Sequence, residues 1–145
     1  MSNNSSVMRS IADYIAEECP LLDRKKPFYL DHIGDKDCYC VNTVPNPSYK
    51  KDIIGNKIYT VTFQFSLRVA ISDDEERADN VAFLEEFREW IEDQNEHCRF
   101  PDLGFNKTVK SLEVIESGYL DEGDEGNITG IYVTQLQLVY KERKV

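Results

Sequence analysis

The sequence has no apolar run as long as a membrane-spanning helix requires, which is about 20 residues. It begins Met-Ser-Asn-Asn-Ser-Ser, a polar and uncharged stretch with no basic region leading into an apolar one. A secretory signal contains both regions, so we expect a protein of the cytoplasm. In that compartment cysteines stay reduced, and the chain has four: Cys19, Cys38, Cys40 and Cys98.

Positive charge is also scarce. The chain has 17 Lys and Arg residues against 27 Asp and Glu, which gives a formal net charge of −10 at pH 7. A protein that grips DNA or RNA needs clustered Lys and Arg, and an acidic surface repels phosphate. The charge therefore argues against nucleic-acid binding and against an anionic membrane surface. It remains compatible with a channel through which nucleic acid passes without sticking.

The residue types of a catalytic or metal centre are few and poorly spaced. His32 and His97 are the two histidines, and neither is spaced from a cysteine as an activated dyad. Cys38 and Cys40 with His97 and Cys98 offer four zinc ligands, but not in the usual pairs separated by about two to four residues. Buried thiols are therefore favoured over a metal site, and we expect no enzyme, metal or cofactor.

The acidic, glycine-rich segment 121–127 resembles a calcium-binding run but lacks the register of an EF-hand loop. A solvated hairpin loop is favoured, and its carboxylates are candidate docking residues: Asp121, Glu122, Asp124 and Glu125. The glycines of this region are expected in turns and not in a phosphate cradle: Gly118, Gly123, Gly126 and Gly130.

Length and composition indicate a single domain, residues 1–145, with 41% hydrophobic and 30% charged residues. Helical spacing of apolar residues predicts a first amphipathic helix over about residues 5–18. A second helix is predicted from a capping box at Ser72 and Glu75 to a C-terminus near His97. Phe87 and Trp90 are its expected core anchors.

Alternation of apolar and polar residues predicts strands at Cys38–Val44, Lys57–Ile71, Thr108–Ser117 and Ile128–Lys141. The loop 23–37 contains at most a short edge strand near Phe28–Leu30, and residues 45–56 form a long connection. Val109 and Ile115 are expected on the opposite face of their strand from Leu112 and Val114. The order α-β-β-α-β-β predicts an α+β fold: a twisted, mainly antiparallel four-stranded sheet with two helices packed on one face.

Two helices on one face leave the polar side of the long strands uncovered. Solvent exposure is one explanation; the other is a surface that lines a ring or faces neighbouring subunits. The candidate positions are Thr60, Thr62, Gln64, Ser66, Gln135 and Gln137.

Four segments resemble the minor capsid and tail-terminator (tail-completion) proteins of long-tailed phages. They are EECPLL at Glu17–Leu22, YCVNTVPNP at Tyr39–Pro47, FLEEFREWIEDQNEHCRFPDLG at Phe83–Gly104, and SLEVIESGYL at Ser111–Leu120. These are packing motifs and not active-site motifs. The resemblance implies a virion structural protein that forms a ring, of six subunits, on the end of the tail tube.

The resemblance also implies the partners. They are further copies of the chain, the tail tube protein and the head–tail connector protein, while genomic DNA passes through the ring and no membrane is involved. The protein would be assembled in the host cytoplasm and located in the virion tail. The loops Pro45–Asn56 and Asp121–Gly126 are the expected contacts to tube or connector, and the long strands are expected to reach a neighbour. The alternative left open is a small acidic cytoplasmic inhibitor or adaptor that binds one protein partner.

Overall fold

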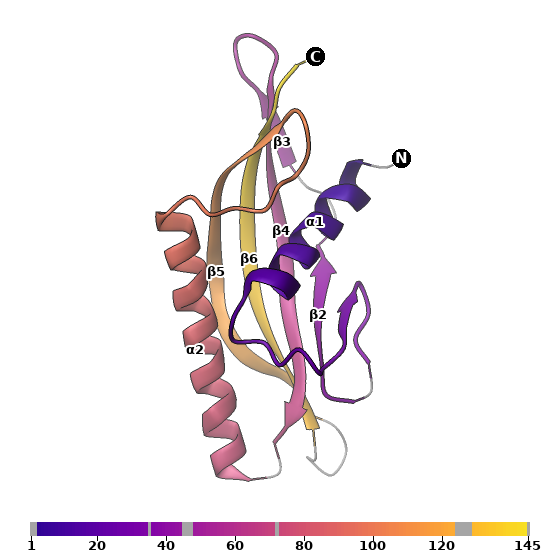
Figure 1. Cartoon of the computed structure of the whole chain (residues 1–145), viewed down its shortest axis with the longest axis vertical. Coiled ribbons are helices and arrows are strands. Elements are labelled where there is room, and N and C mark those ends of the chain that lie inside the picture. The colour runs from indigo at the N-terminus through magenta and orange to yellow at the C-terminus, as the bar shows by residue number, and fades with distance from the viewer. Residues whose placement is uncertain (1–2, 35, 45–47, 72, 124–128, 145) are drawn as a thin grey trace.

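A computed structural model describes residues 3–34, 36–44, 48–71, 73–123 and 129–144, and it shows a long sheet with two helices on one face (Figure 1). Both helices and the facing side of the sheet contribute to a shared apolar core. Within the described residues, neither helix is long and apolar enough to cross a membrane. The elements are α1 (Asn3–Glu18), β1 (Phe28–Leu30), β2 (Cys38–Thr43), β3 (Ser48–Lys51), β4 (Lys57–Ala70), α2 (Asp74–Glu96), β5 (Lys107–Gly123) and β6 (Thr129–Glu142).

Among the described residues the sheet has six strands, which corrects the expected number of four. It is mixed but mainly antiparallel, as expected. The strand order is β1-β2-β4-β6-β5, and β3 pairs with the N-terminal end of β4. β1 runs parallel to β2, whereas the other pairings are antiparallel. The α+β class is confirmed.

The additional strand β3 lies in the segment that was expected to be a plain connection. Its residues pair with Lys57–Thr60 of β4. Gly55 adopts a φ of 90°, a conformation open to glycine without strain, and this closes the turn between the two strands. All four residues of β3 are exposed, so the strand has no apolar alternation by which the sequence would reveal it.

Helix α2 is capped one residue later than the sequence pattern indicated. The N-cap is Asp73, whose carboxylate accepts a hydrogen bond of 2.8 Å from the backbone N–H of Glu76. Ser72, the expected cap, lies outside the described residues. The helix ends at Glu96 with His97 as its C-cap, which confirms the expected C-terminus.

The two expected anchors of α2 have different environments. Phe87 is fully buried and stacks on Phe65 of the sheet, with ring centroids 4.3 Å apart and an interplanar angle of 13°. Trp90 is only partly buried, and its ring lies 5.6 Å from that of Tyr14 in α1. Phe87 therefore joins α2 to the sheet, whereas Trp90 joins it to α1.

Strand β5 is irregular, with four register shifts against β6. The shift between Val109 and Ser111 inserts a residue, so that Val109 and Leu112 both face the core although their spacing is odd. The expectation that Val109 faces away from Leu112 is therefore wrong. Ile115 is exposed, in agreement with its expected position on the other face.

Gly118 lies within β5 and is not a turn glycine. A Cβ at this position would lie 2.5 Å from Cδ1 of Leu84 in α2 and 2.8 Å from Oγ1 of Thr134 in β6. The missing side chain thus lets α2 approach the sheet closely. Two other expected turn glycines are also in paired strands, Gly123 and Gly130, while Gly126 lies outside the described residues.

Candidate functional site

The face of the sheet away from the helices carries a band of neutral polar side chains. The register places Asn42, Gln64 and Gln135 side by side on β2, β4 and β6. The next row pairs Thr62 with Gln137. All five residues are partly exposed. The fold therefore brings together positions selected from the sequence and adds Asn42, which alternation along a single strand did not reveal.

The remaining two positions differ in exposure. Thr60 lies opposite Val139 and is partly exposed. Ser66 is only 2% exposed, and its hydroxyl accepts a hydrogen bond of 3.4 Å from Nδ2 of Asn42. Ser66 lies on the same face as the band, next to the row of Gln64, but its side chain is buried in the single chain.

On the β5 side, the band becomes acidic. Glu113 lies opposite Gln137, and Glu116 lies opposite Gln135; both carboxylates belong to exposed residues. Amides and hydroxyls donate and accept hydrogen bonds, while ionised carboxylates only accept them. This combination suits recognition of a polar surface or hydration, and none of these band residues is a cation that could bind a phosphate.

The cysteines that raised the question of a metal centre lie on different elements. Cys38 and Cys40 are buried on β2, while Cys98 is exposed after the end of α2. Burial raises the pKa of Cys40 to about 11, so this thiol stays protonated at neutral pH. Its Sγ donates to Oδ1 of Asn42 at 3.2 Å. Among the described residues, the one group of three or more close metal-ligand side chains contains no cysteine.

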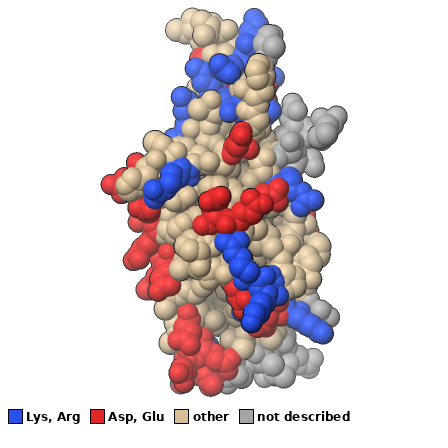
Figure 2. Space-filling view, in the orientation of Figure 1, with Lys and Arg blue, Asp and Glu red and all other residues tan. Residues whose placement is uncertain are grey.

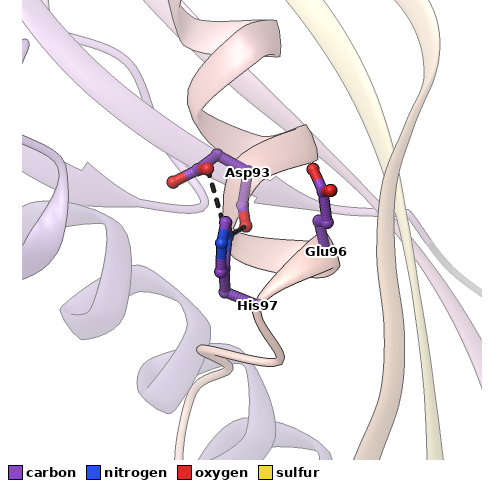
Figure 3. A group of neighbouring side chains, drawn as sticks. All are labelled: Asp93, Glu96 and His97. Atoms are coloured by element: carbon purple, nitrogen blue, oxygen red, sulfur yellow. Dashed lines mark hydrogen bonds and ion pairs between the residues drawn. The ribbon is translucent and has the colours of Figure 1, made fainter.

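That group is Asp93, Glu96 and His97 at the C-terminus of α2 (Figure 3). All three are exposed, and Nδ1 of His97 lies 3.2 Å from a carboxylate oxygen of Asp93 and 3.0 Å from its backbone oxygen. The other carboxylate oxygen of Asp93 accepts a 2.6 Å hydrogen bond from Arg99. A metal would have to displace both partners of Asp93. The arrangement instead caps the helix, where a cationic side chain interacts favourably with the helix dipole.

A hollow of about 540 Å³ lies beside α1, bordered by Tyr14, Gln94 and Arg99. The Tyr14 hydroxyl donates to the backbone oxygen of Arg99 at 2.7 Å and accepts from Nε2 of Gln94 at 2.9 Å. Burial raises the pKa of Tyr14 to about 12, which keeps the hydroxyl neutral. These bonds tie α1 to the loop after α2. No sequence pattern indicates this role for Gln94, because the link depends on packing between distant segments.

The charges of the molecule are unevenly distributed (Figure 2). Lys and Arg gather at the upper end, where β3 and the C-terminus lie, while Asp and Glu line the side formed by α2. The segment Asp73–Glu96 contains eleven carboxylates and two arginines. We name residues 48–58, 105–110 and 141–144 the basic end; it contains eight Lys and Arg residues and two carboxylates. A chain of net charge −10 therefore has one end of charge +6.

The expected acidic docking loop is only partly a loop. Asp121 and Glu122 belong to β5, and Glu122 is paired with Ile131 of β6. Asp124 and Glu125 lie outside the described residues.

The chain matches no protein-family model, and no curated protein matches its sequence.

Proposed function

We propose that this chain is a structural subunit of a phage tail, a tail terminator or tail-completion protein. In this role copies of the chain form a ring, of six subunits, that caps the tail tube and joins it to the head-side connector. Genomic DNA passes through the ring. The proposal begins from the resemblance of Phe83–Gly104 and Ser111–Leu120 to that class of protein; these segments cover most of α2 and β5, which pack together.

The observation that carries the proposal is the two-sided sheet. One face is covered by both helices, while the other exposes a band of amides and hydroxyls on β2, β4 and β6. β4 and β6 are each 14 residues long, and they pair over their whole length, which gives this face a long axis. The central band of this face is neutral to acidic and suits the lining of a ring that DNA crosses without binding, because phosphate finds no cation among the band residues. The cations on the same face, Arg68, Lys50 and Lys141, lie toward the ends of the strands.

Native mass spectrometry with and without polymerised tail-tube protein tests this proposal. The expected result is a hexamer, either of the chain alone or only when tubes are present. A DNA-binding assay on the same samples should give no more affinity for duplex DNA than a generic acidic protein shows. Micromolar binding at physiological salt would contradict passage of DNA through the ring.

A second candidate is a small acidic inhibitor or adaptor that binds one protein partner. It is favoured by the concentration of eleven carboxylates on Asp73–Glu96, because a mimic of nucleic-acid charge needs its acids on one surface. A chain that stays monomeric and ignores tail tubes would favour this candidate over the first.

A further inference from the structure

The turn between β3 and β4 presents apolar side chains to solvent on a firmly built support. Ile53 is fully exposed, and Ile54 is 72% exposed. The turn beneath them is held by Asp52, whose Oδ1 accepts from the backbone N–H groups of Ile54 at 3.1 Å and Asn56 at 2.9 Å. The pKa of Asp52 is lowered because the hydrogen bonds from Asn56 and Ile54 and the charge of Lys141 outweigh its partial desolvation, which acts in the opposite direction. The backbone that carries the two isoleucines is thus held by hydrogen bonds before any partner arrives.

The strands behind this turn are also fixed. The Tyr49 and Tyr59 rings lie 5.3 Å apart, and Tyr59 stacks on Tyr140 at 5.0 Å. The C-terminal segment braces the turn, since the backbone N–H of Lys144 donates to Oδ1 of Asn56 at 2.8 Å. The basic end is therefore a preorganised projection with an apolar tip and a rim of cations, among them the exposed Lys50 and Lys51.

Helix α2 offers a surface of complementary character. A hollow of about 160 Å³ lies between α2 and β5, lined by Val81, Leu84, Glu85, Arg88 and Gly118. Gly118 helps to form it because it contributes no side chain. Val81 is about half exposed. Carboxylates of α2 surround the apolar residues of this hollow. The Nε atom of Arg88 lies 3.7 Å from Oε1 of Glu92 and forms an ion pair with it.

We propose that the tip formed by Ile53 and Ile54 of one copy docks into the hollow beside α2 of a second copy, with the lysines of the basic end against the carboxylates of α2. The occupant is a second copy because the apolar, basic tip of one chain complements in charge and polarity the partly apolar, acidic surface of α2 on another. The two surfaces cannot meet within one chain, since the tip lies at the upper end of the molecule and the N-terminal half of α2 at the lower end (Figure 1). The contact is therefore head-to-tail, the kind that closes into a ring when the rotation permits.

This inference rests on the proposed function in one respect, namely that the head-to-tail contact closes into a ring. It adds to that function by naming the two surfaces that form the interface. It assigns the turn between β3 and β4 to a neighbouring subunit, whereas the resemblance implies that the loop Pro45–Asn56 contacts the tube or the connector.

Charge reversal tests the interface. We would compare the full-length chain with Lys50→Glu/Lys51→Glu and with Glu85→Lys/Glu89→Lys by sedimentation velocity over concentrations up to about 100 μM. The matched control is Lys25→Glu/Lys36→Glu, which reverses two exposed lysines outside the basic end. Each interface variant should weaken self-association about tenfold or more, whereas the control should associate like wild type. Mixing the two interface variants in equal amounts should restore association, because acidic tips then meet basic helices and the reverse.

The apolar part of the contact needs a separate variant. Ile53→Ser/Ile54→Ser should also weaken association about tenfold, with an unchanged melting temperature, because these side chains are exposed in the single chain. A wild-type chain that stays monomeric over the whole range would overturn the inference. So would interface variants that associate normally, or a mixture that fails to restore assembly.

The same variants separate this inference from the proposed function. If Lys50→Glu/Lys51→Glu still forms rings and caps tail tubes like wild type, the interface is wrong and the tail role stands. If wild type associates through tip and α2 but ignores tubes, the interface stands and the tail role is wrong.

Discussion

Replacing Gly118 with alanine tests how closely α2 packs on the sheet. The new Cβ would lie 2.5 Å from Cδ1 of Leu84, 2.9 Å from Cβ of Leu84 and 2.8 Å from Oγ1 of Thr134. The Cδ1 atom is the end of a flexible side chain, but a Cβ atom moves only with its backbone. Thr134 Oγ1 is itself buried and has no hydrogen-bond partner among the described residues, so it gains nothing by moving toward the new methyl group.

The expected magnitude comes from two opposing terms. Overpacking a close contact costs about 1–3 kcal/mol. Alanine also lowers the conformational entropy of the unfolded chain relative to glycine, which raises the free energy of unfolding by about 0.4–1 kcal/mol. Gly118→Ala should therefore lower the free energy of unfolding by about 1–2 kcal/mol.

Urea unfolding followed by the fluorescence of Trp90, the single tryptophan, measures this change. The midpoint should fall by about 0.5–1 M with an unchanged slope. Gly34→Ala is the matched control, because a Cβ there meets mainly the ring of Tyr29, with its nearest atom at 3.0 Å, and that ring can swing away. Its midpoint should change less.

A double-mutant cycle shows whether Leu84 is the cause. Leu84→Ala alone should cost about 2–5 kcal/mol because Leu84 is buried. Combined with Gly118→Ala, the total should be smaller than the sum by about 1 kcal/mol, since the contact with Cδ1 is then absent. Additive costs, or a Gly118→Ala chain as stable as wild type, would refute the close approach as described.

Two further predictions concern the core and its ionisation. Phe87→Ala should lower the free energy of unfolding by about 3–5 kcal/mol, because its buried ring stacks on Phe65. Trp90→Ala should lower it by less, because Trp90 is only partly buried. Urea titrations followed by circular dichroism measure both changes, and equal values would contradict the difference in burial. Stability should also fall as the pH rises from 10 toward 12, because burial raises the pKa of Tyr14 and Tyr140 to about 12 in the folded chain while the unfolded chain releases these protons near 10. Below pH 10 both states hold the protons, so this contribution is then fully present; Tyr14→Phe should flatten the alkaline decline, and an unchanged slope would argue against Tyr14 as its source.

The regular elements were predictable because their patterns are long. β4 alternates over Lys57–Ala70, and its apolar face from Val61 to Val69 is the buried one. α2 is more than six turns long and carries an apolar stripe from Ala78 to Ile91, which is about four turns. In both elements the apolar periodicity recurs often enough to identify the secondary structure even where single residues fit both a helix and a strand.

Three irregular features were not predictable, each for its own physical reason. β3 is exposed throughout and owes its conformation to pairing with Lys57–Thr60. The bulge after Val109 changes the face of a residue without changing its hydrophobicity. Gly118 lies in a glycine-rich part of the sequence, which is typical of turns. Only the position of Leu84 in the structure shows that a glycine is needed there for close packing.

The candidate site was predictable in part. Alternation placed Gln64 and Gln135 on the uncovered face, and pairing then set them side by side. The acidity of α2 is visible in one continuous segment. The basic end is not visible in any one segment, because its cations come from three segments far apart in the chain. The antiparallel pairing of β3, β4, β5 and β6 brings these segments together at one end of the sheet.

The bulges of β5 have a consequence for aggregation. This strand ends the sheet, so 17 residues of backbone stand at a free edge. A straight edge of that length is a template on which another strand adds, and repeated addition produces fibrils. Four interruptions of register break the template into pieces too short for continuous pairing, and exposed Lys110, Glu113 and Glu116 place charges along it. We therefore expect the open edge of this long sheet to resist strand addition from another copy.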